Sequence, residues 1–264
     1  MSGVHVEGRQ EPVAAVPAGT ETRLLPRHHT AGTVYRRVDE NSVQIGEHTT
    51  SIRIERTVTI DDVDSEGILS ISEKITAYER SVDGASAALA REQRDLDAAT
   101  IRYRLTDLGE PVGELEIIDA GRFNEGTLRN VAQASLTQDT LDRTSNLELG
   151  EHRSAENTVS LELAPDARAD LRLQLVYTLA ERTPREARFD IEGTAELPET
   201  LVGRNRVRGT GNVSGRWTID PRDGFAGTRN LELRLYAGRR DAGNRPVGET
   251  TTYIVRRETT ITKR

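Results

Sequence analysis

The chain contains no cysteine, and this absence excludes disulfide bonds, catalytic thiolates and zinc sites with cysteine ligands. Lysine is nearly absent as well: Lys74 and Lys263 are the only two, so almost every positive charge is an arginine guanidinium. No apolar run approaches the ~20 residues that a membrane-spanning helix needs, which predicts no transmembrane segment. Residues 1–26 hold no apolar signal-peptide core and instead carry three prolines.

Aromatic residues make up only 4% of the 264 residues, and apolar residues make up 35%. A core built from so little must come mainly from Val, Ile and Leu on one face of each strand, while the other face stays solvated. That division is typical of antiparallel sheets and unlike the doubly covered sheets of parallel α/β proteins. The composition therefore favours an open, curved sheet.

A predicted hairpin at residues 204–236 gives the clearest structural signal. Val213, Gly215, Trp217 and Ile219 alternate with polar residues, and Leu231, Leu233 and Leu235 alternate after the turn. The turn sequence Asp-Pro-Arg-Asp-Gly at 220–224 has the residue types that β-turns require. Period-two alternation on both sides of a turn predicts a half-buried antiparallel hairpin.

Similar alternation predicts strands along most of the chain. In the first half, Ile52, Ile54, Val58 and Ile60 share one face, with Arg56 as an exception, and Leu69, Ile71 and Ile75 point inward on the returning strand. The predicted strands span residues 33–38, 51–60, 68–78, 100–106, 112–118, 158–163, 171–179, 187–197 and 250–261, besides the hairpin. The predicted fold class is therefore mainly β: an antiparallel, open curved sheet, half-barrel or sandwich with one or two short helices.

Two segments break the alternation and predict these helices. Residues 84–99 are rich in alanine, and residues 125–141 place Leu128, Val131 and Leu136 close to one helical stripe. We expect residues 1–26 to form an N-terminal arm or tail. Residues 27–264 form a β-rich region with two similar halves, about 30–118 and 145–262, joined by a helical crossover.

Charge is unevenly distributed along the chain. Residues 200–264 hold 14 Lys and Arg against 6 Asp and Glu, although the whole chain has a net charge of −7. Arg204, Arg206, Arg208 and Arg216 share one face of a strand and are the candidate site for an anionic ligand or partner. The alternative is pairing with acidic side chains on neighbouring strands. No aromatic residues are interleaved with them, so we expect no nucleic-acid partner.

An acidic turn at residues 62–67 gives the candidate metal site. Asp62, Asp64 and Glu66, with Gly67 and Glu73, have the spacing of a calcium-binding loop. Such loops lie between two helices, whereas both flanks here alternate as strands. A hairpin turn, in which Asp makes side-chain hydrogen bonds and Gly takes a positive φ, is the favoured interpretation.

Motifs of known catalytic mechanisms are absent from the sequence. The five histidines lack the spacing of a hydrolytic zinc site, no serine lies in a G-x-S-x-G elbow, and the glycines at 209, 211 and 215 precede a strand rather than a helix. A catalytic site formed by serine, histidine and carboxylate groups that are distant in sequence but meet in the fold remains an open alternative. The prediction is a non-enzyme without a cofactor.

Three segments resemble a family of uncharacterised bacterial envelope proteins, mostly lipoprotein-like, with a domain of unknown function. They are the hairpin at 58–71, the segment IRYRLTDLGE at 101–110, and Leu149-Gly-Glu followed by residues 158–178 and the block ending IDPRDG at 209–224. The resemblance implies an extracytoplasmic β-fold and assigns no catalytic residues. The chain departs from the family in lacking a lipobox cysteine, so a cytoplasmic or assembly-associated location is the alternative.

These observations predict a non-catalytic extracytoplasmic β-protein that binds an apolar small molecule or a protein partner in the concavity of its sheet. The alternative is a structural subunit that uses its N-terminal arm and edge strands to join a larger assembly, including a homo-oligomer.

Overall fold

The computed structural model describes residues 29–86, 99–106, 111–120, 125, 128–129, 149–164, 167–202, 204–241 and 243–264. The strands in these residues are β1 (Val34–Ile45), β2 (His48–Val63), β3 (Leu69–Val82), β4 (Ala85–Ser86), β5 (Thr100–Leu105), β6 (Glu116–Asp119), β7 (His152–Ala164), β8 (Ala167–Arg182), β9 (Ala187–Val202), β10 (Asn205–Ile219), β11 (Gly227–Arg240) and β12 (Thr251–Lys263).

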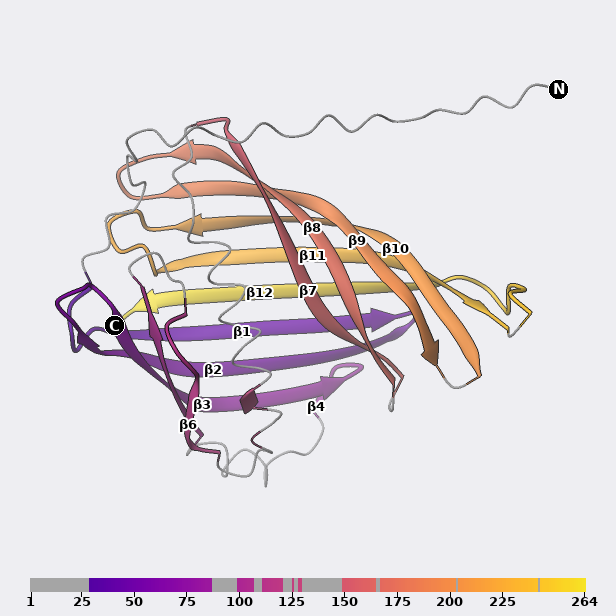
Figure 1. Cartoon of the computed structure of the whole chain (residues 1–264), viewed down its shortest axis with the longest axis horizontal. Helices are drawn as coiled ribbons and strands as arrows, with labels where there is room; N and C mark the ends of the chain where they lie inside the picture. Colours follow the sequence, from indigo (N-terminus) through magenta and orange to yellow (C-terminus); the bar gives the residue numbers. More distant parts are fainter. Residues whose placement is uncertain are drawn as a thin grey trace.

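All of these strands belong to one antiparallel sheet (Figure 1). Their order is β6-β5-β3-β2-β1-β12-β11-β10-β9-β8-β7, and β4 pairs with β3. The last strand therefore pairs with the first, in a ladder that runs from Tyr35–Lys263 to Ile45–Tyr253. The edge strands β6 and β7 do not pair with each other, so the sheet stays open. The predicted mainly β, antiparallel, open architecture is confirmed.

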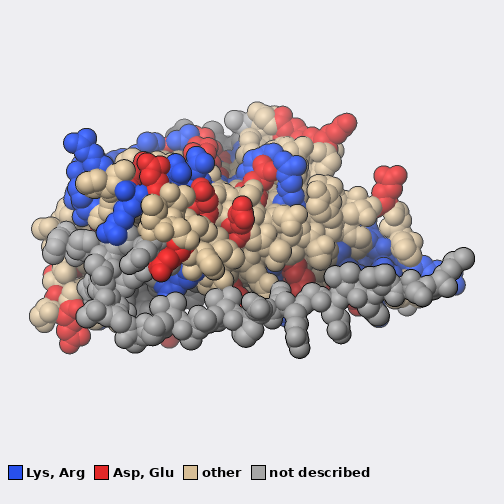
Figure 2. All heavy atoms as spheres, turned by 90° about the horizontal axis from the view of Figure 1, so that it is seen from above, with Lys and Arg blue, Asp and Glu red and all other residues tan. Residues whose placement is uncertain are grey.

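The two faces of the sheet differ in the way that the alternation predicts. On β10, Val213, Trp217 and Ile219 are buried, and on β11 Leu233, which lies opposite Val213, and Leu235 are buried as well. The face that carries these side chains is called the inner face, and the opposite face the outer face. Charged side chains of both signs are interspersed on the surface that Figure 2 shows.

The inner face contains two hydrophobic clusters. One is formed by β8–β12 and includes Leu175, Phe189 and Leu235. The other is formed mainly by β1, β2, β3 and β5 and includes Tyr35, Ile71 and Ile101. Since one cluster lies in each half of the sheet, the pairing of β1 with β12 joins them. The similarity of the two halves in detail stays a prediction.

The sheet curves toward its inner face. In Figure 1, β7 and β8 cross in front of the central strands. Tyr177 on β8 and Arg229 on β11 are separated by two intervening strands, yet Arg229 donates a hydrogen bond of 3.1 Å to the Tyr177 hydroxyl. Adjacent strands lie about 4.8 Å apart, so these side chains meet because the inner face is concave.

The two predicted helices fall largely outside the described residues. Within the first, at residues 84–99, Ala85 and Ser86 form β4 instead of helix. Within the second, at 125–141, Glu125, Leu128 and Arg129 are helical, and Leu128 is buried in the cluster of the first half. No helix in the described ranges is long and apolar enough to span a membrane. The predicted arm, residues 1–26, lies outside the described residues.

Candidate functional site

Charged side chains gather on the inner face where β1, β2 and β12 meet. Asp39 on β1 accepts hydrogen bonds from Arg37 (Nε, 3.0 Å), Arg56 on β2 (Nη1, 2.6 Å) and the Thr259 hydroxyl on β12 (2.8 Å). The strand register explains this meeting, because Arg37 lies opposite Arg56 and Asp39 lies opposite Thr259. Asp39, Arg37 and Arg56 are all buried.

The surroundings keep Asp39 ionised. Burial alone would raise its pKa, but the charges of Arg37 and Arg56, together with hydrogen bonds from Arg37 and Thr259, outweigh burial and hold the pKa of Asp39 below its usual value. A buried carboxylate that accepts hydrogen bonds from three donors has its hydrogen-bonding capacity filled. Asp39 therefore has a structural role rather than that of a proton donor or acceptor.

The cluster continues in both directions across the inner face. On β3, the buried Glu73 accepts a hydrogen bond of 2.6 Å from the Tyr103 hydroxyl and lies 3.9 Å from Nε of Arg56. On the other side, β11 contributes Arg229 and β12 contributes Arg257. We call Arg37, Asp39, Arg56, Glu73, Arg229 and Arg257 the inner charge cluster.

The inner charge cluster has four guanidinium groups and two carboxylates, which gives its described members a charge of +2. Guanidinium groups stay charged at any physiological pH, so they cannot serve as acid–base catalysts. They can bind an anion through directed hydrogen bonds. The arginines of this site are therefore suited to anion recognition.

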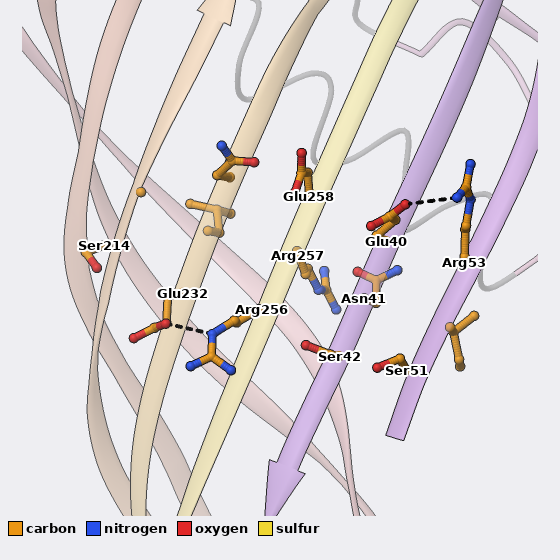
Figure 3. Close-up of a pocket in the computed structure, with 14 residues that line it drawn as sticks. Glu40, Asn41, Ser42, Ser51, Arg53, Ser214, Glu232, Arg256, Arg257 and Glu258 are labelled. Carbon is orange, nitrogen blue, oxygen red and sulfur yellow. Dashed lines mark hydrogen bonds and ion pairs between the residues drawn. The ribbon is translucent and has the colours of Figure 1, made fainter. Parts of the chain in front are cut away.

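A polar groove of about 810 Å³ crosses the middle strands (Figure 3). Its lining consists of two neighbouring rows of outer-face residues that run across the strands, and of the inner-face row between them. The first outer row is Glu40, Arg53, Asn230 and Glu258, and the second is Ser42, Ser51, Ser214, Glu232 and Arg256. The inner row is Asn41, Ile52, Gly215, Leu231 and Arg257. If the groove opened on the inner face, the inner-face rows on either side of this one would form its walls. No residue of those rows lines the groove, so it opens on the outer face.

Two ion pairs lie in the groove. Arg256 donates a hydrogen bond of 2.9 Å to Glu232, and Arg53 lies 3.5 Å from Glu40. Hydrogen bonds from Arg234 first, and then from Arg256, lower the pKa of Glu232 despite partial burial. Exposed pairs of this kind contribute about 0–1 kcal/mol each. The groove is thus a solvated polar surface in which Glu40, Arg53, Glu232 and Arg256 are paired.

The acidic turn at residues 62–67 has the hydrogen bonds of a hairpin turn. Asp64 Oδ1 accepts hydrogen bonds from the backbone N–H groups of Ile68 and Glu66, both 2.9 Å, and Oδ2 accepts one from Arg104. Gly67 has a φ of 79°. Hydrogen bonding by these backbone groups lowers the pKa of Asp64. Asp62 and Glu66 are exposed, and no group of three or more potential ligands able to hold a metal occurs in the described residues.

The predicted arginine site is spread along the outer face of β10. Arg206 donates a hydrogen bond of 3.0 Å to Glu199, and Arg216 lies 3.6 Å from Asp190 on β9. Arg204 lies in the turn before β10, and Arg208 is exposed on the strand. Two of the four arginines therefore pair with acidic residues of the neighbouring strand.

Sequence reasoning missed the inner charge cluster. Its one signal was Arg56, which shares a face with Ile54 and Val58 where an aliphatic residue is expected. Its partners Asp39 and Glu73 lie on the neighbouring strands β1 and β3, and the pairing of β1 with β12 adds Thr259.

No protein-family model matches the chain, and no curated protein matches it. Among solved structures, the chain is similar to lipovitellin, in a structure concerned with lipid–protein interactions, with a TM-score of 0.49 and 13% identity over 88% of this chain and 25% of that one. It is also similar to an outer membrane channel from Pseudomonas putida F1, with a TM-score of 0.23 and 11% identity over 94% of this chain and 100% of that one. The chain spans about a quarter of the lipovitellin chain.

Proposed function

We propose that the protein is a non-catalytic binding protein that holds an apolar ligand on the inner face of its curved sheet. The observation that carries this proposal is the aliphatic character of that face at both ends of an open sheet. Leu171, Leu175 and Leu179 follow one another along β8, and Val58 and Ile60 do so along β2. The extracytoplasmic location stays a prediction based on the sequence resemblance.

The open edges give such a ligand a route to the inner face. Because β6 and β7 do not pair with each other, they can separate further without breaking any hydrogen bond between the two strands. A closed sheet would lose backbone hydrogen bonds in the same movement, and each unsatisfied buried group is costly. An open sheet can therefore admit an apolar chain without losing backbone hydrogen bonds between its edges.

The single tryptophan allows a direct test. Trp217 is buried on the inner face and stacks on Phe189 with ring centroids 4.7 Å apart. A brominated apolar chain such as 1-bromododecane should quench its fluorescence in a saturable manner. The control is 2-bromoethanol, which carries the same quencher without the chain and should quench weakly and linearly. Equal, non-saturable quenching by both compounds would contradict the proposal.

A second candidate function is that of a structural subunit, and the edge strand β7 favours it. This strand has 13 residues, and within the described part of the chain only β8 pairs with it. An exposed edge of that length can add a strand from another molecule. Light scattering across a wide range of concentrations separates the candidates: a monomer supports the binding protein, and a defined multimer supports the subunit.

A further inference from the structure

We infer that the end of the sheet formed by the β9–β10 and β11–β12 connections docks on an anionic lipid surface. The two connections lie at the same end of the sheet, on the right in Figure 1, because the start of β10 pairs with the end of β11. We call the described residues of 199–208 and 236–249 the basic end. The inference concerns the exposed side chains of this end rather than the buried clusters of the inner face, so it goes beyond the proposed function and does not depend on it.

Arginines outnumber acidic residues at the basic end. The acidic residues are Glu199, Asp241 and Glu249, and the net charge of the basic end is +3. Lysine is absent from it, so every positive group is a guanidinium, which stays charged at any physiological pH and binds phosphate through two parallel hydrogen bonds. The arginines are Arg204, Arg206, Arg208, Arg239, Arg240 and Arg245.

The strand register places two of these charges against each other. Arg206 on β10 lies directly opposite Arg240 on β11, and like charges in opposite positions on neighbouring strands are destabilising. Arg206 has a partial counter-charge in Glu199, to which it donates a hydrogen bond of 3.0 Å. Arg240 instead donates a hydrogen bond of 2.9 Å to the uncharged backbone carbonyl of Asn244. Anionic head groups beside this pair would reduce the repulsion.

Two further arginines are available to an anionic partner. Arg208 and Arg239 are exposed, and within the residues that the structure describes neither has an ion pair or a side-chain hydrogen bond. Arg239 lies opposite Val207, so it is close to the Arg206–Arg240 pair. These guanidinium groups can therefore reach an external phosphate without giving up a partner in the protein.

Exposed apolar side chains lie among the arginines. Leu201 on β9 is directly opposite Arg206 and is 70% exposed. Val247 is 38% exposed, and its backbone N–H donates a hydrogen bond of 2.9 Å to the carbonyl of Arg239. Tyr236 on β11 is 48% exposed, and tyrosine is enriched at the boundary between a bilayer and water.

This combination fits an anionic bilayer better than a nucleic acid. Arginines attract the negative surface of the bilayer, and aliphatic side chains between them gain free energy by entering its apolar boundary. A nucleic acid also attracts arginines, but a single strand is recognised by stacking of its bases on several aromatic side chains. The basic end carries one aromatic residue, Tyr236, beside the aliphatic Leu201 and Val247.

Flotation of the full-length protein with lipid vesicles tests the docking. We expect binding to vesicles of phosphatidylcholine and phosphatidylglycerol in equal parts, much weaker binding to phosphatidylcholine alone, and a decrease with increasing salt. Arg208→Gln and Arg239→Gln should each weaken binding to the mixed vesicles about fivefold, the contribution of one arginine near an anionic surface. Leu201→Ser should weaken it roughly tenfold, because the apolar side chain no longer enters the bilayer.

Arg185→Gln is the matched control. Arg185 is an exposed arginine just before the start of β9, whereas Leu201 lies near the end of that strand, so vesicle binding should stay unchanged. Failure to bind the mixed vesicles, equal binding to phosphatidylcholine alone, or an equal loss in Arg185→Gln would overturn the inference. A single-stranded oligonucleotide is the soluble polyanion for comparison. Oligonucleotide binding as tight as vesicle binding, with neither affected by Leu201→Ser, would show a nucleic-acid surface instead.

Discussion

At the scale of single residues, Asp39 is the group on which the middle of the sheet depends. Its carboxylate joins β1, β2 and β12 through hydrogen bonds from Arg37, Arg56 and Thr259. Asp39→Asn removes the negative charge that Arg37 and Arg56 share in the buried cluster. We expect a loss of about 3–5 kcal/mol in the free energy of unfolding, measured by urea denaturation, because uncompensated buried charges are strongly destabilising.

Glu55→Gln provides the comparison for that variant. Glu55 also joins two arginines, Arg36 and Arg53, but it does so on the outer face with 21% of its side chain exposed. Exposed pairs contribute little, so we expect a change of less than about 1 kcal/mol. Similar losses in the two variants would show that burial does not decide the contribution of Asp39.

The same carboxylate makes stability depend on pH. The folded-state pKa of Asp39 lies below its unfolded value of about 3.9, because the arginines outweigh the effect of burial. Its contribution is therefore fully present above that value and is lost as the pH falls through the folded-state pKa. Urea midpoints between pH 6 and pH 2 should fall less steeply in Asp39→Asn than in the unchanged protein. Parallel curves would contradict this assignment.

At the scale of elements, β10 approaches β11 closely because glycines lie on its inner face. A Cβ atom at Gly211 would lie 2.2 Å from the backbone oxygen of Arg234 on β11. Gly211→Ala must therefore separate the strands locally, and we expect a loss of about 1–3 kcal/mol in thermal or urea unfolding. Gly238→Ala on β11 is the control, since a Cβ there meets nothing within 4 Å. Its effect should stay within about 1 kcal/mol.

The elements that the sequence predicted well are those with an aliphatic inner face. Alternation located β8, β9 and the β10–β11 hairpin because their inward residues are Leu, Ile, Val and aromatic residues. The predicted strand at 33–38 stops short of β1, which continues to Ile45. Beyond residue 38, the inward residues of β1 include Asp39 and Asn41. The alternation of apolar and polar residues is therefore lost, although the strand continues.

The candidate site was hidden for a related reason. The calcium-like spacing of Asp62, Asp64 and Glu66 is visible along the sequence, whereas the partners of Arg56 lie on the neighbouring strands β1 and β3. Local patterns reveal turns and hairpins because their contacts are close in sequence. An ion cluster assembled from five strands requires the sheet order, which periodicity alone does not determine.

At the scale of the whole molecule, the sheet is a meander interrupted by the chain ends. Apart from the pairing of β1 with β12, neighbouring strands in the sheet follow one another along the chain from β1 to β6 and from β7 to β12, with β4 as a side branch. The contact between Asp39 and Thr259 spans 220 residues. The two hydrophobic clusters, and the contacts of Asp39 with Arg37 and Arg56, can thus form from local contacts, but the hydrogen bond from Thr259 to Asp39 must wait for the ends to meet.

A circular permutant tests this order of events. The backbone N–H of Arg264 donates a hydrogen bond of 2.9 Å to the carbonyl of Val34, so a short linker can join residue 264 to residue 29, with new ends in the connection between β6 and β7. Asp39 and Thr259 would then be separated by roughly twenty residues, which reduces the loop-closure cost by roughly 2 kcal/mol. If closure of the β1–β12 ladder limits folding, stopped-flow refolding should be roughly ten- to thirtyfold faster in the permutant, at unchanged unfolding rate. An unchanged refolding rate would place the limiting step within one half of the sheet, and the two clusters, rather than the ladder that joins them, would then control how the molecule folds.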